Sequence, residues 1–344
     1  MVNILTKLLL LLSPIVYGLS INLDKLDLRF FEIGCIVLFV GSLFDKPKRE
    51  VKDIRLPIAL LVGLCIVNAF WHNYQPLDLH AIQYLFYGIL AFYIMVRYLD
   101  KPEECFKYIY WAIGTNIVIA YLQRIGYTPI ISFSHYGAYI GCEGGLLGNS
   151  SKLAIYIAMI LPFMSWFAIP LGALTLISGE YIVLIPLGLM LYFRSKYKIL
   201  TTSLMTIGVV ILHKQILNSL IFRWNNSWSQ MLDMIFKKPL LGYGFGTYHI
   251  WTGRESFNNY LLLIFGFGVL GAVWMGYLVK WFIKRFDKSN EALAVAALLI
   301  MGMVEYVMEI PRLWLTICFV LAIFVIKQKG RGYGKNNLHF SRPQ

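Results

Sequence analysis

The polar residues best suited to chemistry lie close together in the second half of this 344-residue chain. Arg223 and Arg254 carry permanent positive charges, and a guanidinium group binds two phosphate oxygens at once. His249 lies between them in the sequence, and a histidine exchanges a proton near neutral pH. These residue types suit chemistry at a phosphate group with a proton acceptor nearby. Two plainer interpretations stay open: Arg223 as a lipid-surface anchor beside Trp224, and His249 as an ordinary loop residue.

A run of alternating glycines, G-Y-G-F-G, follows at positions 242–246. No strand and helix flank the run, so it does not match a dinucleotide-binding fingerprint. Glycine adopts backbone conformations that other residues avoid, and it lets backbone amides approach a ligand closely. Gly242, Gly244 and Gly246 therefore predict either a loop that binds an oxyanion or a tight turn.

The segment 224–238 joins the arginine to the glycine run and carries apolar residues at helical spacing. The residues that share one face of such a helix are Trp224, Trp228, Met231, Leu232, Ile235 and Phe236. An amphipathic helix of this kind lies in a membrane interface, where it would hold the cations at headgroup depth. A structural lid over a helix bundle is the equally open alternative.

The composition predicts the elements that must position these residues. Apolar residues make up 58% of the chain and charged residues 14%, and uncharged runs of membrane-span length recur throughout. A soluble domain of this length would need more polar surface. We therefore expect an all-α polytopic membrane helix bundle, with one transmembrane domain over 1–327 and a disordered basic tail over 328–344.

The positions of the basic residues predict the topology. Lysine and arginine concentrate in the loops 45–55, 97–107 and 280–288, and such loops stay on the cytoplasmic side. Only twelve crossings keep every basic loop there, with both termini cytoplasmic and the loop 214–258 outside. The predicted spans are 4–20, 28–44, 56–71, 81–98, 107–124, 153–166, 168–178, 180–193, 199–213, 259–280, 291–308 and 313–327.

The formal charge of +13 has the same explanation, so we do not expect a nucleic-acid partner. The histidines and cysteines lack the spacing of metal ligands. We therefore expect no metal and no other cofactor.

Two segments resemble the O-antigen ligase and Wzy-type polymerase superfamily of bacterial envelope glycan enzymes. The first is G-L-L-G-N-S-S-K-L-A at 145–154, and the second runs from 223 to 271. The residues that fit the family pattern are Gly148, Asn149, Leu153, Ala154, Arg223, Trp228, Pro239, Leu240, Gly242, Gly244, Gly246, Asn258, Gly268 and Gly271.

The resemblance implies a glycosyltransferase in the bacterial inner membrane. It would move a glycan from an undecaprenyl-pyrophosphate carrier to a lipid or glycan acceptor at the outer leaflet, without a metal. Arg223 would act at the pyrophosphate. The substrate-binding residues that the resemblance implies are Arg223, Gly242, Gly244, Gly246, Asn258 and Asn149. Arg254 is an additional cation in the same loop, and we expect it to bind the substrate as well.

The chain departs from the family pattern at two places. Phe257 stands where the family has a histidine, and Gly179 with Glu180 stands where it has an arginine. His249 is our candidate for the missing base, with Glu143 and Glu255 as rivals. A transporter or flippase for lipid-linked sugars remains an alternative, as does a non-catalytic relative that modulates a polysaccharide polymerase.

Overall fold

The computed structural model describes residues 1–13, 20–23, 26–71, 79–125, 147, 150–164, 184–194, 196–253, 258–304 and 311–337. Within these residues the fold is helical, apart from one antiparallel hairpin that pairs β1 (Ser20–Leu23) with β2 (Leu26–Arg29). The helices are α1 (Val2–Leu12), α2 (Phe30–Leu43), α3 (Lys52–Trp71), α4 (Leu79–Tyr98), the 3₁₀ turn η1 (Pro102–Cys105), α5 (Phe106–Arg124), α6 (Ser150–Ile160), the 3₁₀ turn η3 (Leu161–Phe163), α8 (Leu184–Arg194), α9 (Lys198–Arg223), the π-helical turn η5 (Trp224–Trp228), α10 (Ser229–Lys237), α11 (Tyr248–Thr252), α12 (Asn259–Arg285), α13 (Asn290–Met301) and α14 (Pro311–Asn337).

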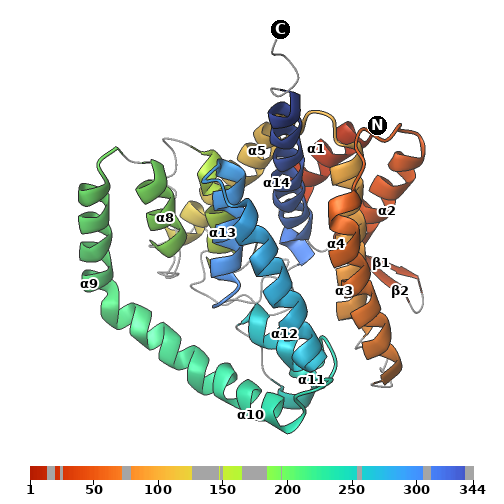
Figure 1. Cartoon of the computed structure of the whole chain (residues 1–344). Helices are drawn as coiled ribbons and strands as arrows, with labels where there is room; N and C mark the ends of the chain where they lie inside the picture. Colours follow the sequence, from red (N-terminus) through yellow and green to blue (C-terminus); the bar gives the residue numbers. More distant parts are fainter. Residues whose placement is uncertain are drawn as a thin grey trace, which may run out of the picture.

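The helix α14 passes through the middle of the bundle and packs along α4 (Figure 1). Gly88 in α4 permits this close packing, because a Cβ atom there would lie 2.6 Å from the Trp314 ring. By contrast, α9 exposes large apolar side chains such as Ile199, Val210 and Ile211. Apolar residues exposed in this way suit a helix that faces lipid.

Four helical stretches are long and apolar enough to cross a membrane. They are Ile54–Trp71, Pro102–Gln123, Lys198–Lys237 and Asn259–Arg285. The other apolar helices in the described part of the chain are shorter, at 10–17 residues. The helical, membrane-type fold thus agrees with the sequence, whereas twelve complete crossings remain a prediction.

The basic loops gather at one end of the molecule, which we call the basic end. The ammonium group of Met1 donates to Asp45 at 2.9 Å, and the amide of Lys48 donates to the carbonyl of Arg97 at 2.8 Å. Lys327 pairs with Glu103. Loops that are far apart in the sequence therefore meet at one end, as their shared charge predicts.

The segments that follow α8 and α12 also lie at the basic end. The side-chain amide of Gln328 donates to the carbonyl of Arg285 at 3.0 Å, and the Lys288 ammonium lies 5.6 Å from the centre of the Phe193 ring. The end of α8 therefore lies beside the connection from α12 to α13. The four crossings predicted within 153–213 also put this end of α8 on the basic side, but residues 165–183 lie outside the described part of the chain, so their number remains a prediction.

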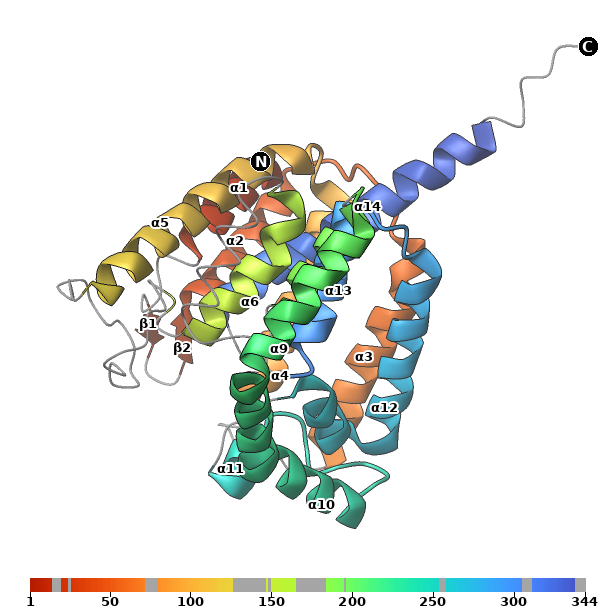
Figure 2. The ribbon, with the colours of Figure 1, turned by 90° about the vertical axis from the view of Figure 1, so that its left-hand side faces the viewer.

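The predicted loop 214–258 differs from the structure in its first part, 214–223, which is helical, whereas the helix predicted over 224–238 is present as η5 and α10. Helix α9 does not end near 213 but continues through η5 into α10, giving one helical stretch of 40 residues, Lys198–Lys237. It runs down one side of the molecule and then beneath the bundle (Figures 1 and 2). No proline lies between Lys198 and Pro239, and proline is the residue that ends a helix most effectively.

Two smaller predictions also change. The hairpin replaces the loop predicted at 21–27. Helix α14 continues to Asn337, so residues 328–337, predicted to belong to a disordered tail, are helical. Lys327 bonds Glu103 of η1, and the side-chain amide of Gln328 donates to the carbonyl of Arg285 at the end of α12. Residues 338–344 lie outside the described part of the chain.

Candidate functional site

The candidate residues converge at the end of the molecule opposite to the basic end. Here η5, α10, α11 and the start of α12 lie together at the bottom of Figures 1 and 2. We call this region the site end. Hydrogen bonds connect its parts: Tyr248 of α11 bonds Ser227 of η5, while Arg223 and Asn258 both bond the turn 302–304.

The centre of the site end is a break in α12. Gly268 has φ 62° and ψ −145°, which is not a helical conformation. A break leaves backbone carbonyls without their usual partners, and buried carbonyls need new donors. The amide of Tyr243 donates to the carbonyl of Phe265 at 2.7 Å, and the amide of Gly244 donates to that of Gly266 at 3.2 Å. The glycine run thus supplies the donors that the broken helix lacks.

The backbone of α12 directly after the break also forms a hydrogen bond with the preceding loop. The amide of Val269 donates to the carbonyl of Pro239 at 2.8 Å. The two backbones come so close that a Cβ atom on Gly268 would lie 2.3 Å from the carbonyl oxygen of Leu240. The Pro-Leu pair of the sequence motif is therefore one side of a backbone-to-backbone contact with α12.

The three glycines of the run all have positive φ angles. The values are 70° for Gly242, 106° for Gly244 and 82° for Gly246, a region that residues with a side chain rarely adopt. The amides of Gly242 and Gly244 donate to the carbonyls of Lys238 and Gly266. Of the two roles predicted for the run, the geometry displays the tight turn. Binding of an oxyanion by this run remains a prediction.

Two pairs of stacked aromatic rings hold the glycine run against the broken part of α12. The rings of Tyr243 and Phe265 stack at 5.0 Å with 8° between their planes, and those of Phe245 and Phe267 stack at 5.2 Å with 11°. Stacked rings add to the stability that burial provides. The glycine run and the break in α12 therefore form one interlocked unit, which we call the glycine clasp (239–246 with 265–269).

Asn68, in α3, bonds both halves of the glycine clasp, and it was not among the residues predicted from the sequence. Its side-chain nitrogen donates to the carbonyl of Gly266 at 2.8 Å, and its side-chain oxygen accepts from the amide of Phe245 at 2.9 Å. The residue is only 4% exposed. The available signal was an asparagine inside an apolar span, since polar groups are costly there and usually have a purpose.

Arg223 ends α9 and is buried, with 5% of its surface exposed. Its Nε donates to the carbonyl of Val304 at 2.8 Å, and a terminal nitrogen donates to the hydroxyl of Ser219. An anchor at the lipid surface would keep its charged head in water, so the burial of Arg223 argues against that alternative. The residue joins α9 to the turn that follows α13.

The segment 224–238 forms η5 and α10 instead of one regular helix. Met231 and Ile235 are buried, whereas Trp224 is 50% and Phe236 77% exposed. The single apolar face predicted for this segment is therefore only partly buried against the protein. The hydroxyl of Ser229 bonds the carbonyl of Trp224 at 2.9 Å, which satisfies part of the turn.

His249 lies in the short helix α11, and its side chain is exposed. The preceding Tyr248 is almost fully buried, and its hydroxyl donates to the carbonyl of Ser227 in η5 at 3.2 Å. This bond fixes α11 against the turn that directly follows Arg223. The exposed histidine and the buried arginine are therefore held by the same piece of structure.

Asn258 caps the start of α12. Its side-chain oxygen accepts from the amides of Tyr260 and Leu261 at 2.9 Å, as expected of an asparagine cap. Its side-chain nitrogen donates to the carbonyl of Met303 at 2.7 Å. Asn258 and Arg223 thus both bind the turn 302–304. Asn258 therefore has an evident role in orienting helices, while its contact with a substrate stays a prediction.

Several candidates cannot be placed. Asn149, Arg254 and Phe257 lie outside the described residues, as do the rival bases Glu143 and Glu255 and the departures at Gly179 and Glu180. Within the described residues, no three side chains of the types His, Cys, Asp and Glu gather as metal ligands would.

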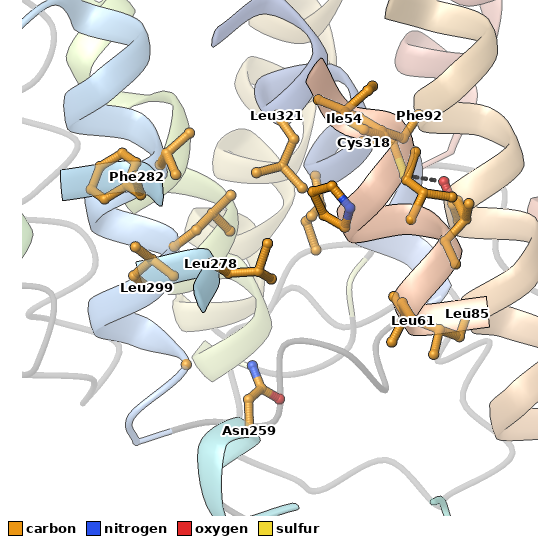
Figure 3. A pocket seen from close by; sticks show the side chains of 18 of the residues that line it. Ile54, Leu61, Leu85, Phe92, Asn259, Leu278, Phe282, Leu299, Cys318 and Leu321 are labelled. Atoms are coloured by element: carbon orange, nitrogen blue, oxygen red, sulfur yellow. Dashed lines mark hydrogen bonds between the residues drawn. The ribbon is translucent and has the colours of Figure 1, made fainter. Parts of the chain in front are cut away.

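An apolar cavity of about 310 Å³ extends from the site end into the bundle, between α3, α4, α12, α13 and α14. In Figure 3, Phe282 and Leu299 lie on one side, Leu61 and Leu85 on the other, and Asn259 at the lower end. Gly302 also lines the cavity, and it belongs to the turn that binds Arg223. A hydrocarbon chain suits such a lining.

No protein-family model matches the chain, and no curated protein is similar to it.

Proposed function

We propose that this protein is a membrane glycosyltransferase that transfers a glycan from a polyprenyl-pyrophosphate carrier to a lipid or glycan acceptor. One observation supports this proposal most: the buried Arg223 bonds the turn 302–304, and Gly302 of that turn lines an apolar cavity. The exposed His249 follows Tyr248, which bonds Ser227 in the turn after Arg223. A lipid-linked pyrophosphate has an anionic head and a hydrocarbon tail, so its two parts match the two parts of the site. The resemblance to O-antigen ligases and polymerases supports the same class of substrate.

In the proposed reaction, the bond between the anomeric carbon of the glycan and the pyrophosphate oxygen breaks. The electron pair of that bond leaves with the polyprenyl pyrophosphate, and the acceptor hydroxyl oxygen bonds to the anomeric carbon. Arg223 would stabilise the negative charge that grows on the leaving group, since a fixed cation is most effective where charge develops. His249 would take the proton of the acceptor hydroxyl.

The cavity would accommodate part of the hydrocarbon tail. Its lining runs from Asn259 and Gly302 at the site end to Phe282 and Phe324 deeper in the bundle. A chain that enters there would keep the pyrophosphate near the turn 302–304, where Arg223 is bonded.

A transporter for lipid-linked sugars is the second candidate, and the break in α12 favours it. Discontinuous helices are typical of transporters, in which unwound carbonyls coordinate ions or substrate. Here the carbonyls of Phe265 and Gly266 accept from the glycine run and from Asn68. Because the break is closed by protein donors, we prefer the enzyme.

The test is glycan transfer by the purified protein in lipid nanodiscs, with an undecaprenyl-pyrophosphate-linked glycan as donor. We expect transfer by the wild type. Arg223→Lys should lower the rate by about 10²–10³-fold, the loss typical when a donor to developing charge is removed, because lysine lacks the bidentate fork. Arg285→Lys is the matched control. That arginine stacks on Trp281 at 4.4 Å and lies at the basic end, so transfer should persist.

Wild-type rates in Arg223→Lys would contradict the proposed role of the arginine. Because Arg223 also bonds Val304, thermal unfolding of the variant must be measured alongside, so that loss of fold is not taken for loss of chemistry. Movement of the labelled donor across vesicles without transfer would favour the transporter. If the protein neither transfers nor transports any donor that is tried, that result would favour the third alternative, a non-catalytic relative.

A further inference from the structure

We propose that Asn68 is a positioning residue, which fixes the glycine clasp and through it places His249 relative to Arg223. The inference rests on the proposed glycosyltransferase function for its catalytic consequence. Its structural part stands on the hydrogen bonds of the clasp alone. Asn68 belongs to α3, far in sequence from both halves of the clasp, and none of the motifs in the sequence includes it.

The first step concerns the carbonyl of Gly266, which the break at Gly268 removes from the regular helical pattern. This carbonyl accepts two hydrogen bonds, from the amide of Gly244 at 3.2 Å and from the side chain of Asn68 at 2.8 Å. The bond from Asn68 is the shorter one and is buried. Asn68 therefore secures the α12 side of the clasp.

The second step concerns the loop side of the clasp. The amide of Phe245 donates to the side-chain oxygen of Asn68 at 2.9 Å, and this bond is also buried. One planar amide group thus satisfies an acceptor on α12 and a donor on the loop. Only a side chain that carries a donor and an acceptor on one carbon can bridge the two in this way. Leucine has a similar volume but carries neither group, and aspartate keeps only the acceptor.

The third step leads from the clasp to the candidate base. Thr247 follows the loop closely, and its hydroxyl donates to the carbonyl of Gly244 at 2.9 Å. Thr247 also precedes the first turn of α11, where Tyr248 bonds to Ser227 and His249 is exposed. A loop released from Asn68 would therefore shift α11 relative to η5. That shift would separate His249 from its place beside the turn that follows Arg223.

The test compares Asn68→Leu and Asn68→Asp with the wild type. Asn116→Leu is the matched control, since Asn116 is also a buried asparagine of an apolar helix but donates to Ala112 of its own helix at 2.9 Å. Residue-resolved amide hydrogen exchange measures the clasp, and steady-state glycan transfer measures kcat and KM. Exchange needs no activity, so the two parts of the proposal are tested separately.

We expect the Phe245 amide to exchange faster in Asn68→Leu but to stay protected in Asn68→Asp, which keeps its acceptor. Asn68→Leu should lower kcat by about 10²-fold, as small displacements of catalytic groups do, with little change in KM. The control Asn116→Leu should leave both the exchange of Phe245 and kcat unchanged.

Wild-type exchange at Phe245 in Asn68→Leu would overturn the structural part of the inference. Faster exchange with an unchanged kcat would overturn the positioning role. If Asn68→Leu does not fold, Asn68→Asp still decides the matter: exchange at Phe245 should remain slow, and fast exchange would count against the bridge. Absence of transfer by the wild type would instead overturn the proposed function, and the exchange comparison would still decide whether Asn68 holds the clasp.

Discussion

At the scale of single residues, Arg223 and His249 occupy opposite environments. Arg223 is buried and donates to the carbonyl of Val304, whereas His249 is exposed on α11. A buried cation is held in place before any substrate arrives, and an electrostatic contact is stronger away from water. The exposed histidine can be reached by an acceptor from outside. This difference fits a lipid-linked donor that enters from the bundle and an acceptor that enters from solvent.

His249→Ala should slow transfer by about 10²–10⁴-fold, the range typical for general-base assistance. The control is His213→Ala, because His213 is also exposed but lies within α9, where its Nδ1 is hydrogen-bonded to the carbonyl of Val210 at 2.6 Å. Initial rates at saturating donor would be compared. Nearly normal rates in His249→Ala would contradict its role as the base and would favour Glu143 or Glu255.

The residues of the site were only partly predictable from the sequence. The glycine run and the cap at Asn258 have local signatures, because their roles depend on their own backbone. The only local signature of Asn68 is an asparagine inside an apolar span, because its partners Phe245 and Gly266 lie 177 and 198 residues away. Residues whose function comes only from a distant contact cannot be found by spacing.

At the scale of elements, the break in α12 and the glycine run depend on each other. Gly268 provides a conformation that a side chain would strain, and the loop provides the donors that the break requires. Neither segment would be stable at this place alone, since buried backbone groups must be paired.

Gly268→Ala should destabilise the protein by about 1–3 kcal/mol from backbone strain alone, because φ is 62° and a Cβ atom would lie 2.3 Å from the Leu240 carbonyl. Gly276→Ala, in the same helix, is the control. Nothing lies within 4 Å of its added Cβ atom, so it should be neutral or stabilising by about 0.5–1 kcal/mol. Thermal unfolding in one detergent would compare them, and equal effects of both substitutions would contradict the role of the break.

The elements themselves were predicted with uneven success. The apolar helices α3, α4, α5 and α12 match the predicted spans closely, because long apolar runs are a strong signal. The extension of α9 beyond 213 was missed, because its polar residues resembled a loop. Polar residues such as Lys214 and Gln215 are good helix formers, and here they continue the preceding helix.

At the scale of the whole molecule, the basic end and the site end are separated by the length of the bundle (Figure 2). If that length crosses a membrane, single cysteines at Asn225 and at Lys46 must be labelled from opposite sides. Both positions are exposed. The native cysteines of the described part of the chain, Cys35, Cys65, Cys105 and Cys318, are buried, so their background should be low. Labelling of both positions by the same impermeant reagent in sealed cells would contradict the topology.

The basic end also predicts a dependence of stability on pH. The ammonium group of Met1 and then the amide of Val2 hold the pKa of Asp45 below its usual value. Because the folded-state pKa is lowered, this contribution is complete above the unfolded-state pKa and is lost as pH falls through the folded-state pKa. The difference in Tm between the wild type and Asp45→Asn should therefore be present at neutral pH and vanish in acid.

That difference should be small, since exposed ion pairs contribute little. Asp233→Asn, at an exposed position of α10, is the matched control and should shift Tm less. A difference for Asp45→Asn that persisted unchanged into strong acid would argue against the ion pair.

The turn η5 sets the rotational phase of everything that follows it. A π-helical turn bonds one residue further along the chain than an α-helical turn, and each residue advances an α-helix by about 100°. The turn η5 therefore holds one residue more than an α-helical turn, while α10 keeps nearly the orientation that an uninterrupted helix would give it. A chain one residue shorter between Trp224 and Trp228 could form a regular helix with Met231 and Ile235 still facing the core that they now fill. An additional residue would instead rotate α10 by about 100°, so insertions should be tolerated less well here than deletions.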